Sequence, residues 1–87
     1  MDNVGLEASN AWKIPVSIWP NPTRDKLNIK SSVPLEATLY TIEGRIILKK
    51  KKARSLSLNG LAEGVYILHC YDEAGRLLHY EKVVKGL

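Results

Sequence analysis

The stretch Leu61-Ala62-Glu63-Gly64-Val65-Tyr66 decides the fold that the sequence predicts. In Greek-key sandwiches, a tyrosine near the start of the sixth strand hydrogen-bonds back to the preceding connection, an arrangement called the tyrosine corner. Tyr66 occupies that position, and the leucine and glycine upstream let the backbone fold close to its ring. The alternative is an ordinary half-buried strand tyrosine. If Tyr66 faces the core, alternation along the strand places Leu68 and Cys70 there too.

Short β-rich runs separated by turn residues continue along the chain from Lys13, at the spacing of about 8 to 12 residues that is typical of a sandwich or barrel. No segment keeps a helical apolar period over three turns. Leu27 and Ile29 share one face of a predicted strand, while Glu43-Gly44 and Ala74-Gly75-Arg76 predict hairpin turns. We therefore predict an all-β, Greek-key fold of two packed antiparallel sheets. Its strands lie near residues 14–19, 26–30, 35–42, 45–51, 54–58, 64–71 and 76–85.

A chain of 87 residues makes one small domain. Residues 1–12 are small and polar without a period, and we expect a disordered linker or tail there, with the domain in residues 13–87. The first residues lack the basic and apolar regions of a secretory signal peptide, so any export signal is expected upstream. Apolar runs such as Ile46-Ile47-Leu48 are far shorter than the roughly 20 residues that span a bilayer, so we predict no membrane-spanning segment.

Catalytic and metal chemistry would have to use His69, Cys70 and His79, the only imidazoles and thiol in the chain. Adjacent strand residues point to opposite faces, so His69 and Cys70 cannot bind one metal or form a catalytic pair. Most carboxylates are scattered singly, and the chain has no phosphate-cradling glycine loop and no nucleophile elbow. The sequence therefore predicts no enzyme, no metal and no cofactor.

The basic character of the chain is local. Its net charge is +4, and four of the thirteen cationic residues form the run Lys49–Lys52. This run can attract phosphate or an anionic polysaccharide, but a solvated hairpin end or a protected sheet edge explains it equally well. A nucleic-acid site would interleave aromatic rings with the cations, and none lie between Tyr40 and Tyr66. We expect no nucleic-acid partner.

The stretch Trp19-Pro20-Asn21-Pro22 predicts a sharp turn at the end of the first strand. Each proline fixes φ at about −65° and has no N–H, which leaves Asn21 free to bond neighbouring amides.

Four segments now match, in order and spacing, the type A C-terminal sorting domain of the type IX secretion system of Bacteroidetes, which this chain resembles. They are Trp19-Pro20-Asn21-Pro22-Thr23, Leu39-Tyr40-Thr41-Ile42-Glu43-Gly44-Arg45, Leu61 to Tyr66, and Lys82-Val83-Val84-Lys85. The resemblance implies an immunoglobulin-like sandwich of seven strands. It also implies a targeting function, in which the domain carries an N-terminal cargo from the periplasm through the outer-membrane translocon to the cell surface or medium. The implied partners are translocon and shuttle proteins, and a cell-surface sortase that removes the domain and joins the cargo to an anionic lipopolysaccharide.

The resemblance also carries over a set of recognition residues. They are Pro20, Asn21, Pro22, Gly44, Arg45, Gly64, Tyr66, Lys82, Val83, Val84 and Lys85. Most of them can equally serve only to preserve the fold, whereas Arg45, Lys82 and Lys85 are expected to project from strand ends. The last strand can be recognised by pairing along the edge of a partner, or the folded sandwich can be recognised as a surface.

Two positions depart from the family pattern. Trp19 stands where tyrosine is more usual, and Thr41 stands where an aspartate commonly follows the tyrosine, which puts the ordering of that turn in question.

The rival function is an immunoglobulin-like adhesion or carbohydrate-binding module, for which Trp12, Trp19 and Tyr80 are the candidate sugar-contacting aromatics.

Overall fold

The computed structural model describes residues 14–86. The predicted linker, residues 1–12, lies outside this part, as do Lys13 and Leu87. The described residues contain no helix and form seven strands whose bounds differ from the predicted ranges by at most two residues. The strands are β1 (Val16–Trp19), β2 (Lys26–Ser31), β3 (Glu36–Thr41), β4 (Ile46–Lys50), β5 (Ser55–Ser57), β6 (Gly64–Tyr71) and β7 (Leu77–Lys85).

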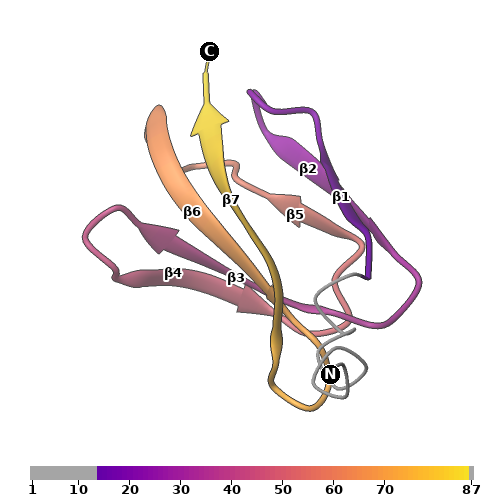
Figure 1. The fold of residues 1–87 in the computed structure, drawn as a ribbon. Helices are drawn as coiled ribbons and strands as arrows, with labels where there is room; N and C mark the ends of the chain where they lie inside the picture. The colour runs from indigo at the N-terminus through magenta and orange to yellow at the C-terminus, as the bar shows by residue number, and fades with distance from the viewer. Residues whose placement is uncertain (1–13, 87) are drawn as a thin grey trace, which may run out of the picture.

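The strands form two antiparallel sheets that face each other (Figure 1). One sheet has the order β1-β2-β5 and the other β4-β3-β6-β7. The chain leaves the larger sheet after β4, pairs β5 with β2, and returns to place β6 beside β3. This Greek-key connectivity is that of an immunoglobulin-like sandwich, so the predicted fold class is confirmed.

The core lies between the two sheets and is built mainly from leucine. Alternation puts Leu27 and Ile29 of β2 opposite Leu39 of β3 and Leu68 of β6, and all four are buried. Burial of one such side chain contributes about 1.5 to 3 kcal/mol. The fully buried large side chains are Leu27, Leu35, Leu39, Leu56, Leu58, Leu68, Val83, Thr38 and Cys70.

The predicted tyrosine corner is present at the start of β6. The Tyr66 hydroxyl donates a hydrogen bond of 2.5 Å to the carbonyl oxygen of Ala62, four residues upstream. Gly64 supplies the bend between them with φ of +150°, a value that side chains rarely adopt. The ring is 8% exposed, and Leu68 and Cys70 face the core beside it.

We predict that Tyr66→Phe lowers the free energy of unfolding by about 1 kcal/mol, because it removes one hydrogen bond and keeps the packed ring. Urea denaturation followed by circular dichroism measures this change. Tyr80→Phe is the matched control, because Tyr80 is 68% exposed on the outer face of the sheet. Equal stability of the Tyr66 variant and the wild type would contradict the role of the corner.

Candidate functional site

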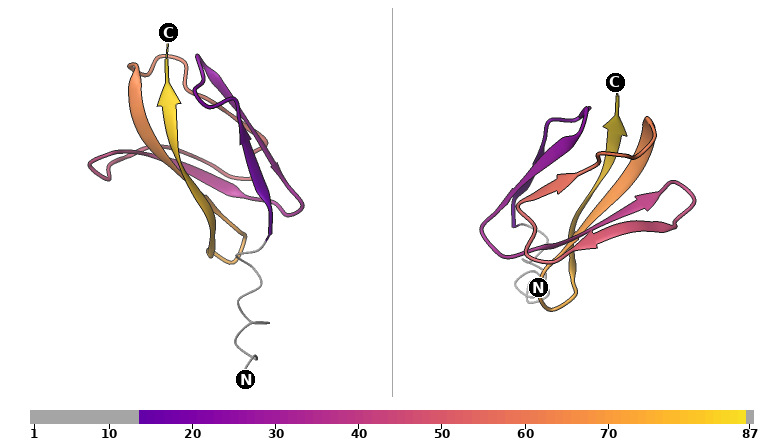
Figure 2. Two further views of the ribbon diagram at one scale, coloured as in Figure 1. Left: turned by 45° about the horizontal axis from the view of Figure 1, so that its top comes forward. Right: turned by 180° about the vertical axis from the view of Figure 1, so that it is seen from behind.

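The segment after β1 lies along the end of β7, more than 60 residues away in the sequence. The Thr23 amide donates to the Val84 carbonyl at 2.9 Å, and the Gly86 amide donates to the Thr23 carbonyl at 2.8 Å. These bonds form a parallel bridge between Thr23 and Lys85. The β1–β2 connection and the C-terminus accordingly lie at the same end of the sandwich, here called the signature end (Figure 2).

The Asn21 side chain extends this contact along β7. Its Nδ2 donates to the Lys82 carbonyl at 2.7 Å and to the Glu81 carboxylate at 3.0 Å, and its Oδ1 accepts from the Val84 amide at 3.0 Å. Only a primary amide offers two donors beside an acceptor in this arrangement. Aspartate would lack the donors and would place a second carboxylate beside Glu81.

These contacts cover the free edge of β7. Main-chain groups of Lys82, Val84 and Gly86 bond to Asn21 and Thr23 on the side of β7 that faces away from β6. An open strand edge would leave such groups available to pair with another chain. From Lys82 to Gly86, a partner strand can add only if the segment from Asn21 to Thr23 moves away.

The four residues of the last motif divide into two groups. Val83 is completely buried in the core, whereas Lys82 is exposed on the outer face of the sheet. Lys85 differs from the expectation that it projects from the strand end. Its Nζ turns inward and donates to the carbonyls of Leu58 at 2.9 Å and Leu61 at 2.6 Å, which closes the loop between β5 and β6.

The third motif pairs directly with the fourth. In the β6–β7 ladder, Gly64 lies opposite Lys85, Val65 opposite Val84, and Tyr66 opposite Val83. The first, third and fourth motifs therefore form one continuous structure at the signature end.

The second motif forms the hairpin between β3 and β4, apart from that structure. Gly44 has φ of +94°, and its amide donates to the Thr41 carbonyl at 2.9 Å. The Arg45 amide donates to Thr41 Oγ1 at 3.1 Å, so the threonine hydroxyl orders the turn. Among the described residues, the exposed Arg45 side chain contacts neither Asn21 nor the end of β7.

The hairpin between β6 and β7 repeats this arrangement with an aspartate. The Arg76 amide donates to Asp72 Oδ1 at 2.9 Å, and the Gly75 amide donates to the Asp72 carbonyl at 3.0 Å. The bond from the Arg76 amide is the main cause that lowers the pKa of the Asp72 carboxyl. Thr41 and Asp72 thus each accept a hydrogen bond from the backbone amide four residues later, in two different hairpins. The β3–β4 turn is therefore ordered with threonine in place of the aspartate that is common in the family.

His69 and Cys70 point to opposite faces of β6, as alternation predicts. Cys70 is fully buried, and burial, followed by the charge of Glu81, raises the pKa of its thiol to about 11. The His69 ring lies on the outer face, 4.6 Å from the Tyr40 ring. The thiol is therefore protonated at neutral pH, and the two side chains do not meet.

Sequence reasoning missed the roles of Thr23 and Glu81. Thr23 is 3% exposed, and its Oγ1 donates to the Lys26 carbonyl at 2.8 Å and accepts from the Asp25 amide at 3.2 Å. The spacing of Thr23 and Asp25 is a signal for such a local turn. Nothing local marks Glu81 as a partner of Asn21.

The fold and its closed signature end define a small immunoglobulin-like module whose sequence motifs gather around the last strand. Residues 17–85 match the family described as the secretion system C-terminal sorting domain, and the chain belongs to this family. The domain is a C-terminal sorting signal of the type IX secretion system, and proteins that carry it are exported to the cell surface or secreted.

One similar protein is "Beta-agarase D" of Zobellia galactanivorans. The two are 29% identical over 70 residues, which cover 79% of this chain and 15% of the agarase. The chain therefore spans only a small part of the length of this relative.

We predict that Asn21→Ala speeds hydrogen exchange of the Val84 amide by about tenfold and lowers the free energy of unfolding by about 1 to 2 kcal/mol, because hydrogen bonds to β7 are lost. Exchange followed by NMR measures both effects. Asn59→Ala is the control, since Asn59 lies exposed in the turn after β5. Unchanged protection of Val84 in the Asn21 variant would show that the edge is not held by this side chain.

The role of the Thr41 hydroxyl in the β3–β4 turn can be tested by substitution. Thr41→Val keeps the side-chain shape but removes the acceptor of the Arg45 amide, and should cost about 0.5 to 1.5 kcal/mol of stability. Thr41→Ser retains the hydroxyl and should retain the hydrogen bond. Thermal unfolding compares the variants, and equal losses in both would rule out the hydroxyl as the ordering group.

Proposed function

We propose that this domain directs a cargo lying N-terminal to it through the outer membrane by the type IX secretion system. The cargo crosses the periplasm and reaches the cell surface or the medium, where a cell-surface sortase removes the domain and anchors the cargo. The domain is not itself an enzyme, and the sortase acts in trans. The observation that carries the proposal is the family match over residues 17–85, with its first and last motifs locked together at the signature end.

The covered edge of β7 favours recognition of the folded surface over pairing with the last strand. Translocon or shuttle proteins would then contact exposed side chains of the larger sheet. Lys82 on β7 and Arg45 beside the β3–β4 hairpin are exposed.

The remaining signature residues would maintain the surface rather than contact the partner. Tyr66, Asn21 and Lys85 do so by their hydrogen bonds, and Val83 by its burial. Pro20, Pro22, Gly44 and Gly64 would act through the backbone of the turns, and the half-buried Val84 through packing.

No helix in residues 14–86 has the length and apolar character needed to span a bilayer.

A carbohydrate-binding role is the second candidate, and one observation favours it. The outer face of the larger sheet carries an aromatic cluster in which the His69 ring lies 4.6 Å from Tyr40, 5.8 Å from Tyr71 and 6.1 Å from Tyr80. Trp19 is 46% exposed on the other sheet, and Trp12 lies outside the described residues. A sugar module would lose binding when Tyr80 is replaced by alanine, whereas a sorting signal would still be exported.

The sorting function is tested with residues 13–87 fused behind a reporter that carries a signal peptide, in a host with this secretion system. We expect surface delivery of the fusion, retention in the periplasm when residues 82–87 are removed, and a mass for the released reporter that places the sortase cut before the domain. Retention of the complete fusion in the periplasm would refute the proposal.

Paired lysine variants separate recognition from folding. Lys82→Ala should reduce export while leaving stability within about 0.5 kcal/mol of the wild type, because its side chain is exposed. Lys85→Ala should lower stability by about 1 to 3 kcal/mol through loss of its two carbonyl contacts. Lys30→Ala, exposed at the opposite end of β2, is the control for charge. Normal export of the Lys82 variant would remove this residue from the contact surface.

A further inference from the structure

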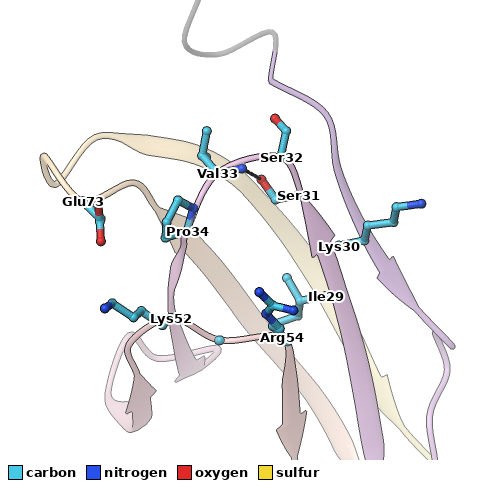
Figure 3. A pocket seen from close by; sticks show the side chains of 10 residues that line it. Ile29, Lys30, Ser31, Ser32, Val33, Pro34, Lys52, Arg54 and Glu73 are labelled. Atoms are coloured by element: carbon cyan, nitrogen blue, oxygen red, sulfur yellow. Dashed lines mark hydrogen bonds between the residues drawn. The ribbon is translucent and has the colours of Figure 1, made fainter.

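A hollow of about 540 Å³ opens at the end of the sandwich opposite the signature end. It lies between the loop from β2 to β3 and the loop from β4 to β5 (Figure 3). Its volume falls within the range of about 300 to 1,000 Å³ that is usual for small-molecule pockets. The lining is partly apolar, through Ile29, Val33 and Pro34, and partly charged.

Cationic side chains outnumber anionic ones around this hollow. Lys30, Lys52 and Arg54 line it, with Glu73 as the single carboxylate. The ion pairs found within residues 14–86, Asp72 with Arg76 and Glu81 with His79, involve none of these four. The lining formed by the described residues therefore keeps a net positive charge.

Of the three cations, Arg54 and Lys52 are the candidate groups for binding an anion, because the Lys30 side chain points to one side in Figure 3. In Figure 3 the Arg54 guanidinium lies beside Ile29, below the loop of Ser31 to Pro34, and Lys52 extends toward the side of Glu73. A guanidinium presents a planar set of N–H donors that matches two oxygens of a phosphate or sulfate group. An ammonium nearby adds attraction that is less specific in direction.

The backbone around these two cations is held firmly. The Ala53 amide donates to the Leu35 carbonyl at 2.9 Å, and the Ile29 amide donates to the Arg54 carbonyl at 2.9 Å. Lys52 directly precedes these two attachments and has φ of +50°, the one positive value outside glycine among the described residues. A side-chain-bearing residue persists in this conformation only where its surroundings impose it, and such positions are concentrated at binding sites.

We propose that this hollow binds a small organic phosphate or sulfate ester. The oxyanion lies against the guanidinium of Arg54, and Lys52 adds positive charge from the side of the hollow near Glu73. The organic part lies on the apolar surface of Val33 and Pro34, which explains why the hollow is larger than an oxyanion alone requires. The site is independent of the sorting function, because it is formed by loops at the other end of the sandwich.

Titration of the complete 87-residue chain, labelled with ¹⁵N, tests this proposal. Glucose 6-phosphate, glucose 6-sulfate, inorganic phosphate and glucose are the probes. We expect saturable shifts of the amides in residues 31–33, 35 and 52–54 with one or both esters, weaker binding of inorganic phosphate, and none of glucose. Absence of saturable shifts with either ester would overturn the proposal, as would equal affinity for inorganic phosphate and the ester.

A matched pair of variants distinguishes a site from diffuse attraction. Arg54→Gln should weaken binding of the ester by about tenfold, because it removes the paired donors. Lys49→Gln removes the same charge from the outer face of β4, which does not line the hollow, and should change affinity less than about twofold. Equal losses in the two variants would mean that ligands respond only to the net charge.

Discussion

The side chain of Asn21 is the interaction on which the rest of the signature end depends. It joins the connection of the smaller sheet to the edge strand of the larger one through donors and an acceptor that alternate as the main-chain groups of β7 do. Each such bond contributes only about 0.5 to 1.5 kcal/mol. In a domain whose total stability is about 5 to 15 kcal/mol, a few of them decide whether the last strand stays in place.

This constraint gives the family motifs a common physical purpose. Asn21 closes the edge of β7, Lys85 closes the loop before β6, and Tyr66 closes the bend by which that loop enters β6. Thr41 closes the β3–β4 hairpin by the same type of bond that Asp72 makes in the β6–β7 hairpin. Asn21, Tyr66 and Lys85, which belong to the sequence motifs of the sorting domain, therefore also satisfy polar groups at strand ends. The exposed members of the signature set are Pro20, Asn21, Pro22, Gly44, Arg45 and Lys82.

The strands and both hairpins could be predicted because their signals are local: alternation, glycine at turns, and a tyrosine four residues from its acceptor. The contact between Asn21 and Val84 spans 63 residues, and neither end carries a local sign of the other. The inward turn of Lys85 depends on where the loop carbonyls of Leu58 and Leu61 lie, which follows from the packing of two sheets. Alternation predicts on which face of the sheet a side chain lies, but it does not predict which residues pack against that face.

The environment of each lysine in the run Lys49–Lys52 also depends on the tertiary structure and not on local sequence alone. Lys49 and Lys50 lie on β4, an edge strand of the larger sheet, where lysine opposes pairing with other chains. The Lys50 ammonium also donates to the Ser55 carbonyl at 3.2 Å, so it links this edge to the smaller sheet. The larger sheet thus has a lysine-bearing edge at β4 and an edge covered from Lys82 to Gly86 at β7, and both features oppose pairing with another chain. Two residues later, Lys52 already belongs to a loop with different geometry, so adjacent lysines in one run serve different purposes.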